Sequence, residues 1–217
     1  MFAVRPSRRG LVALSSCVLF AAGCAAAEAT PAAHFDEQAC VEHALRSDPD
    51  PDAVAAARIA FEKACDEGRS EACSALGIVY EIGLGVAPDP GRAVGLYALA
   101  CRSGNVRGCT NLAVARVEGL GVPRDDRAGA AVLSTSCDRG DARACLYLAR
   151  LHGGGDAPPA ERALAERLLE FACDGQEAPA CVARAESLAR AGRRDAAFAF
   201  YGKACSLGDA RACSFGE

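Results

Sequence analysis

The chain of 217 residues contains no tryptophan, and its single methionine is Met1. Aromatic residues make up 6 % of the sequence, whereas 51 % of it is hydrophobic, most of that alanine. Small apolar side chains favour helices that approach one another closely. The composition therefore argues for closely packed helices and against a large aromatic ligand pocket.

Signatures of catalysis and metal binding are also missing. The three histidines, His34, His43 and His152, have no partners at ligand spacing, and no Cys-x-x-Cys occurs. Glycine-rich phosphate loops, His-Glu-x-x-His, Gly-x-Ser-x-Gly and the Ser-x-x-Lys and Lys-Thr-Gly signatures of serine β-lactamases are absent. We predict no catalytic residue, no metal site and no cofactor.

Basic residues are outnumbered by acidic ones. The formal net charge is -4, from 24 lysines and arginines against 28 aspartates and glutamates. An acidic surface repels nucleic acid and anionic lipid headgroups. The partners we expect are therefore neither nucleic acid nor a membrane surface.

Residues 1–24 read as an export signal. Three arginines, Arg5, Arg8 and Arg9, precede a short apolar stretch from Leu11 to Ala22, which is too short to span a bilayer comfortably. Ala21 to Cys24 resembles a bacterial lipobox with Cys24 as the lipidated residue, whereas Ala25 to Ala27 would suit an ordinary signal peptidase. Of these two endings we favour the lipoprotein, and both predict export: a periplasmic or outer-membrane lipoprotein, or a secreted protein.

Residues 25–35 are small and polar and predict a flexible tether.

The remainder, 36–217, is organised by its cysteines, which recur in pairs eight residues apart. The first members of the pairs lie at 65, 101, 137, 173 and 205, so the steps are 36, 36, 36 and 32. A fixed period in this range indicates stacked copies of one supersecondary unit, and we expect about four to five repeats. The pairs are Cys65 and Cys73, Cys101 and Cys109, Cys137 and Cys145, Cys173 and Cys181, and Cys205 and Cys213.

Each pair surrounds a glycine that predicts the end of a helix. These glycines are Gly68, Gly104, Gly140, Gly175 and Gly208. Glycine adopts the left-handed conformation that closes a helix at little cost, so the chain can turn back and bring the two cysteines together. The regular pairing among 13 cysteines favours disulfides. Zinc sites are less well supported, haem attachment would need Cys-x-x-Cys-His, and buried thiols remain an alternative.

Between the cysteine pairs, apolar residues recur at helical spacing and predict a helix, a loop and a second helix in each unit. The loop reads Gly-Leu-Gly-Val at 83–86 and again at 119–122, is degenerate at 153–155 and is shortened in the last unit. Asp125 and Asp126 flank a predicted helix start, where carboxylates act as caps rather than catalysts.

These features resemble the Sel1-like repeat, in particular the cysteine-rich Sel1-like proteins secreted by bacteria. The resemblance rests on Cys-x-x-Gly-x-x-x-x-Cys, the Gly-Leu-Gly-Val loop and Ala-x-x-x-Tyr-x-x-Ala-Cys, and it covers the chain from Asp36 onward. The sequence departs from the family pattern at Arg116 and His152, which occupy the positions equivalent to Tyr80 in their units.

The resemblance implies an all-α fold: a solenoid of tetratricopeptide-like αα-hairpins forming a right-handed superhelix. It also implies that each disulfide joins the second helix of one repeat to the first helix of the next. Cys40 would then be unpaired, because its expected partner position is Ala32. Cysteine-rich Sel1-like proteins have been associated with binding and weak hydrolysis of β-lactams, which is the alternative function.

Stacked αα-hairpins curve, and their first helices line a concave surface suited to peptides and proteins. We therefore favour a non-enzymatic, exported, monomeric scaffold that binds a protein or peptide, or a cell-wall fragment, and that meets a membrane only through its N-terminal lipid. The residues expected on the concave face are Glu71, Ser74, Ile78, Arg107, Thr110, Val114, Arg143, Leu146 and Arg150.

Overall fold

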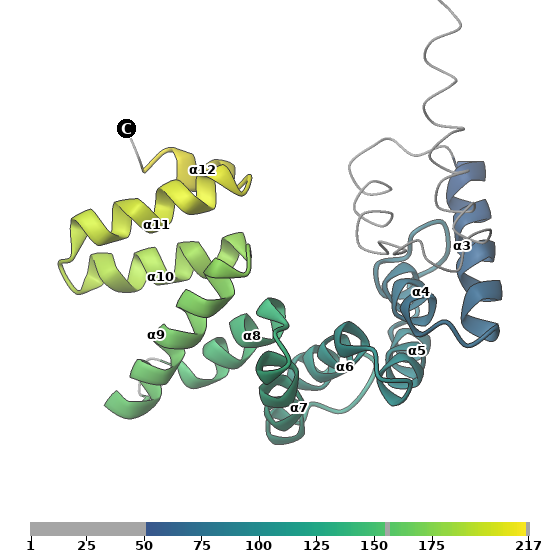
Figure 1. The fold of residues 1–217 in the computed structure, drawn as a ribbon. Coiled ribbons are helices and arrows are strands. Elements are labelled where there is room, and N and C mark those ends of the chain that lie inside the picture. The colour runs from purple at the N-terminus through teal and green to yellow at the C-terminus, as the bar shows by residue number, and fades with distance from the viewer. Residues whose placement is uncertain (1–50, 155–156, 216–217) are drawn as a thin grey trace, which may run out of the picture.

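A computed structural model describes residues 51–154 and 157–215, and all the regular structure in these two ranges is helical. The helices follow one another along a curved array, with α3 and α12 at opposite ends (Figure 1). Their bounds are α3 Pro51–Asp66, α4 Ser70–Ile82, α5 Pro90–Arg102, α6 Val106–Glu118, α7 Asp126–Asp138, α8 Ala142–His152, α9 Pro159–Asp174, α10 Ala178–Arg190, α11 Arg194–Ser206 and α12 Ala210–Cys213.

Each helix packs against the next one in the chain, as expected for stacked αα-hairpins. In addition, α4 contacts α6 and α6 contacts α8, so the first helices of three successive units lie next to one another. The predicted all-α solenoid is confirmed. The predicted export signal, the tether, Cys24 and Cys40 lie outside the described residues.

Short polar side chains fix where the helices begin. Asp89, Asn105, Asp125 and Asp141 precede α5, α6, α7 and α8, and each accepts a hydrogen bond from the backbone amide three residues later at 2.7 to 3.0 Å. Each bond satisfies an amide that has no partner within the helix. The aspartate pair at 125 and 126 therefore includes a helix cap, as its position suggests.

The turns between cysteines follow one pattern with one exception. Gly68, Gly104, Gly140 and Gly208 lie three residues after the first cysteine and have φ between 87° and 95°. In the fourth turn the glycine comes one residue earlier: Gly175 has φ -77°, and Gln176 adopts φ 69° instead. The expectation that Gly175 takes the left-handed position is therefore wrong, because the third residue after Cys173, which takes this conformation, is Gln176.

A close approach explains why glycine stands at 175. A Cβ atom on Gly175 would lie 2.4 Å from the Cβ of Ala142, so the turn can approach α8 only without a side chain. The turn before α10 therefore rests directly on the start of α8. This contact brings the edge of one repeat next to the groove described below.

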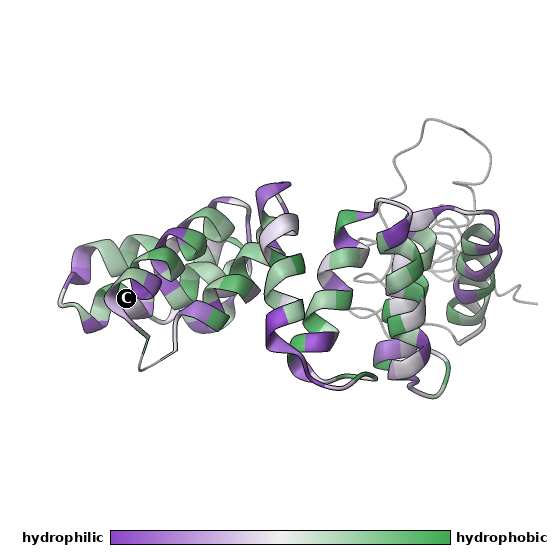
Figure 2. Ribbon diagram, turned by 90° about the horizontal axis from the view of Figure 1, so that it is seen from below, coloured by the Kyte–Doolittle hydropathy of each residue, from purple (hydrophilic) through white to green (hydrophobic). Residues whose placement is uncertain are grey.

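In the part of the chain that the structure describes, the core consists of three hydrophobic clusters along the array rather than one centre. Small residues let the helices approach: a Cβ on Gly77 of α4 would lie 2.4 Å from the ring of Tyr97 of α5. Tyr97 is 1 % exposed, and its hydroxyl donates to Glu81 Oε2 at 2.5 Å. Hydrophobic and hydrophilic residues share each helix of the array, consistent with helices that bury only one side (Figure 2).

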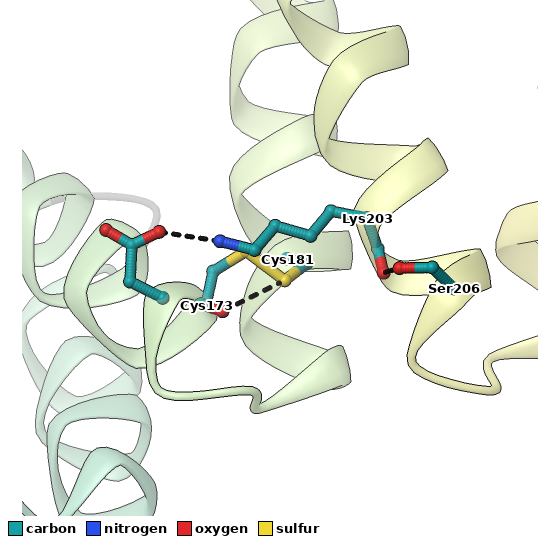
Figure 3. A network of polar contacts seen from close by, with 5 residues as sticks. Cys173, Cys181, Lys203 and Ser206 are labelled. Atoms are coloured by element: carbon teal, nitrogen blue, oxygen red, sulfur yellow. Dashed lines mark hydrogen bonds and ion pairs between the residues drawn. A yellow bond between two sulfur atoms is a disulfide. The ribbon is translucent and has the colours of Figure 1, made fainter.

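Within the described residues, five disulfides link consecutive units, and they join the ten cysteines of the predicted pairs. Cα atoms within each pair lie 4.4 to 4.8 Å apart, within the usual range for a disulfide. Each bridge joins the second helix of one hairpin to the first helix of the next, as α9 and α10 are joined by Cys173 and Cys181 (Figure 3). Beside this bridge, Lys203 Nζ donates to Asp174 Oδ1 at 2.6 Å and ties α11 to the end of α9.

Candidate functional site

A groove of about 690 Å³ runs across the first helices of the array. Its walls come from α4, from α6, from the start of α8, and from the turns that lead into α8 and α10. The residues that line it are Ser74, Ile78, Val106, Arg107, Thr110, Asn111, Arg139, Gly140, Asp141, Ala142, Arg143, Gly175, Gln176 and Glu177. Polar and charged side chains predominate in this set.

Asp141 and Thr110 hold two repeats together in the groove. Asp141 caps α8 by accepting from the amide of Ala144 at 3.0 Å, and its other oxygen accepts from the Thr110 hydroxyl at 3.0 Å. Thr110 is 1 % exposed, and its hydroxyl also contacts the Val106 carbonyl at 3.1 Å. The start of α8 is thereby fixed against α6 at the bottom of the groove.

A second contact across the same boundary joins Asn111 of α6 to Arg143 of α8. Arg143 Nη1 donates to Asn111 Oδ1 at 3.1 Å. Partial burial lowers the pKa of the Arg143 guanidinium, but the neighbouring Tyr147, Glu177 and Glu81 raise it, and the net pKa lies above the ordinary value. Arg143 is therefore a permanent cation of the groove.

Two further arginines line the groove. Arg139 Nη2 donates to the carbonyl of Gly104 at 3.1 Å, which joins the turn before α8 to the turn before α6. Arg107 is exposed and forms no ion pair with any residue in the ranges that the structure describes. The groove thus carries more positive charge than the acidic chain as a whole would suggest.

Of the residues expected on the concave face, five line the groove: Ser74, Ile78, Arg107, Thr110 and Arg143. Val114 and Leu146 are each 6 % exposed and pack into the core clusters instead. Glu71 and Arg150 are exposed and lie outside the lining, and the Arg150 guanidinium is 5.5 Å from the centre of the Tyr147 ring.

Other lining residues were not expected from the sequence. Arg139 and Gln176 lie in the inter-repeat turns, whereas the expectation considered only the first helices. Asn111 lies on α6 at a position that differs between units, with Ala75 36 residues earlier and Tyr147 36 residues later. A polar residue at a position where another unit has alanine is a reason to look for a function.

His152 lies at the end of α8, with Nδ1 3.6 Å from Glu161 Oε2. His34 and His43 lie outside the described residues. Among the residues that the structure describes, no group of three or more histidine, cysteine, aspartate or glutamate side chains is arranged to hold a metal ion. Over the same part of the chain, no helix combines the length and the apolar character needed to cross a membrane.

The fold and its bridges define a disulfide-linked αα-hairpin repeat protein. The model of the Sel1 repeat matches residues 70–105, 106–141, 142–176 and 194–209, which is more than half of the chain. The chain therefore belongs to the Sel1 repeat family. No curated protein matches it.

Solved structures with the same fold support this assignment. A protective antigen of uropathogenic Escherichia coli with a Sel1-like repeat fold is 26 % identical, with a TM-score of 0.60 over 72 % of this chain. This chain spans only 35 % of that antigen. A Sel1 repeat protein from Oxalobacter formigenes is 19 % identical, with a TM-score of 0.64 over 90 % of this chain and 84 % of its own.

An immunity protein from Pseudomonas aeruginosa is also 19 % identical, with a TM-score of 0.63 over 86 % of this chain and 71 % of its own. At this identity the likeness establishes the fold alone. The chain is thus a scaffold of Sel1 repeats, and its disulfides are consistent with an oxidising compartment.

Proposed function

We propose that the chain is an exported, non-enzymatic scaffold that binds a protein or peptide in the groove formed by α4, α6 and the turns before α8 and α10. The observation that carries this proposal is the groove itself, which is lined by exposed cations and by polar groups on neighbouring repeats. An extended peptide can contact successive repeats of such a surface at once.

The disulfides favour a surface that is already in its binding shape. Bridges between α5 and α6, between α7 and α8, and between α9 and α10 hold the repeats that supply the groove. A surface ordered before binding loses less conformational freedom when the partner arrives. The names of the similar structures, an immunity protein and a protective antigen, also favour a protein partner.

Export completes the proposal. Residues 1–24 have the pattern of a signal peptide, and lipidation of Cys24 would anchor the repeats to the cell envelope through a tether over 25–35. Five disulfides need an oxidising compartment, which supports the same location. The anchor is tested by the mass of the mature chain in its host. We expect a lipid-modified chain whose processing is blocked by globomycin, an inhibitor of lipoprotein signal peptidase, and whose lipid is lost in Cys24→Ala.

The binding test is selection from a random peptide library on the disulfide-intact chain. We expect enriched peptides whose binding is lost in Ile78→Arg, because this change places a bulky cation in the groove wall. Arg127→Glu is the matched control, since this exposed residue lies at the other end of α7 from the groove. If no peptide is enriched, or if enriched peptides bind both variants equally, the groove is not the binding site.

A separate assay tests the non-enzymatic part of the proposal. Purified chain should not hydrolyse a chromogenic cephalosporin at a rate above that of the same protein after reduction and unfolding. Saturable turnover that survives repurification would contradict a pure scaffold.

A further inference from the structure

Asn111 places a buried amide at a position where the units before and after it have other residue types. The equivalent position is Ala75, which is 0 % exposed, in the preceding unit, Tyr147 in the next unit and Ala183 in the one after it. Asn111 is itself only 7 % exposed. Burial of an amide is unfavourable unless its hydrogen bonds are made, so the partners available to Asn111 indicate whether it has a role beyond folding.

The contact with Arg143 shows which end of the amide is available. A guanidinium can only donate, so the atom that faces Arg143 Nη1 must be the carbonyl oxygen of Asn111. The NH₂ group of Asn111 is therefore left to donate elsewhere, and no hydrogen bond from it to another described residue is found. Because Asn111 lines the groove, an acceptor supplied by a ligand can reach it.

Two cations flank this amide. Arg143 is bonded to it, and Arg107 lies four residues earlier on α6, so both Arg107 and Asn111 project from the same side of the helix. Nearby, the Ser74 hydroxyl lines the groove from α4 at 1 % exposure. The acidic oxygens of Asp141, in contrast, are both occupied by Ala144 and Thr110. Glu177 also lines the groove and is one of the carboxylates that raise the pKa of Arg143. The lining therefore sets three arginines, Arg107, Arg139 and Arg143, against the two carboxylates of Asp141 and Glu177, so its positive charge exceeds its negative charge.

We propose that Arg107, Asn111 and Arg143 form a carboxylate-binding subsite that takes an acidic side chain of a peptide lying along the groove. This inference rests on the proposed peptide-binding function. A carboxylate has two acceptor oxygens in one plane, which match the parallel N–H groups of a guanidinium and leave lone pairs for the asparagine amide. Nucleic acid is a poor fit, since the surrounding chain is acidic.

The position of the subsite favours a side chain over a chain terminus. Asn111 lies on α6, between the lining residues of α4 on one side and Gln176 and Glu177 on the other. A peptide that uses the whole groove must continue past the subsite in both directions. The residue that it presents to Asn111 is therefore an internal one.

The test uses short peptides with the full, disulfide-intact chain. The first probe is acetylated, C-terminally amidated tetraglutamate, which carries only side-chain carboxylates. Tetraglutamine amide is the neutral control, and tetraglutamine with an unblocked C-terminus carries only a terminal carboxylate. Binding is followed by NMR through the side-chain amide signals of asparagine, with Asn111 assigned by its loss in Asn111→Ala.

Tetraglutamate should shift the Asn111 side-chain signal saturably, whereas tetraglutamine amide should not. Asn111→Ala, which installs the residue of the neighbouring unit, and Arg143→Gln should each weaken binding about tenfold or more. Arg127→Gln should leave binding unchanged.

The subsite is refuted if tetraglutamate produces no shift at about 10 mM, if Asn111→Ala and Arg143→Gln bind like the natural chain, or if only the unblocked C-terminus binds. The peptide-library selection separates this result from a failure of the proposed function. Groove-dependent peptides without acidic residues would leave the binding groove in place and remove only the carboxylate subsite.

Discussion

The hydroxyl of Thr110 and the carboxylate of Asp141 form a hydrogen bond of 3.0 Å that links α6 of one repeat to the start of α8 in the next. Asp141 uses its second oxygen to cap α8 through the amide of Ala144. One carboxylate therefore determines both where a helix begins and how two repeats sit at the groove. Its loss should have two consequences rather than one.

We expect Asp141→Ala to lower the free energy of unfolding by about 2 kcal/mol, of which the cap accounts for about 1 and the contact with Thr110 for the rest. Asp125→Ala is the control, because Asp125 caps α7 through Ala128 at an exposed site and should cost only about 1 kcal/mol. Urea unfolding followed by circular dichroism measures both. Equal losses in the two variants would show that the Thr110 contact contributes nothing.

The features of the fold that the sequence predicts are those that recur with the repeat period. Pairs such as Cys101 and Cys109, with Gly104 between them, predict a helix end, a turn and a bridge, and the structure has all three. These features depend on local backbone chemistry that recurs in every unit. Periodicity therefore determines the fold well.

The groove depends instead on departures from the period, which is why its lining was predicted only in part. Arg139 and Gln176 lie in turns and reach the groove only through the curvature of the array. Val114 and Leu146 have the spacing of groove residues but pack into the core, because neighbouring helices cover them. Which residues a neighbouring repeat covers is not a local property of the sequence.

Gln176 provides a test of backbone strain at the groove edge. Its φ of 69° is unfavourable for any residue with a Cβ, whereas the corresponding Gly140 adopts φ 91° without this cost. Gln176→Gly should raise the free energy of unfolding by about 0.5–1 kcal/mol, the gain being reduced by the greater freedom of glycine in the unfolded chain.

The reciprocal change is Gly140→Ala, which should lower the free energy of unfolding by about 1 kcal/mol through φ alone, because nothing lies within 4 Å of the added Cβ. Thermal unfolding of both variants makes the comparison. A loss of stability in Gln176→Gly would mean that the glutamine side chain contributes more to the folded state than its backbone costs.

Disulfides in the middle and at the end of the array should differ in effect although each closes the same length of chain. Cys173 and Cys181 are each 0 % exposed and join α9 to α10, so their replacement by alanine should cost about 2–3 kcal/mol. Cys205 and Cys213 join α11 to α12, a helix of four residues at the end of the described array. Their replacement should release α12 and leave the other repeats protected.

Amide hydrogen exchange resolves the two cases, because it reports the opening of each helix separately. The amides of α9 and α10 should lose protection when the Cys173–Cys181 bridge is removed and keep it when the Cys205–Cys213 bridge is removed. Loss of protection along the whole array in the second variant would show that the end of the array supports the centre.

Tyr97 predicts how stability depends on alkaline pH. Burial, followed by the hydrogen bond to Glu81, holds the pKa of the Tyr97 hydroxyl well above its ordinary value of 10. The unfolded chain therefore loses this proton at a lower pH than the folded chain does, so the stabilising contribution is complete below pH 10 and declines as the pH rises above it. Urea midpoints measured across this range should fall less steeply in Tyr97→Phe than in the natural chain. An unchanged slope in Tyr97→Phe would show that another group governs alkaline unfolding.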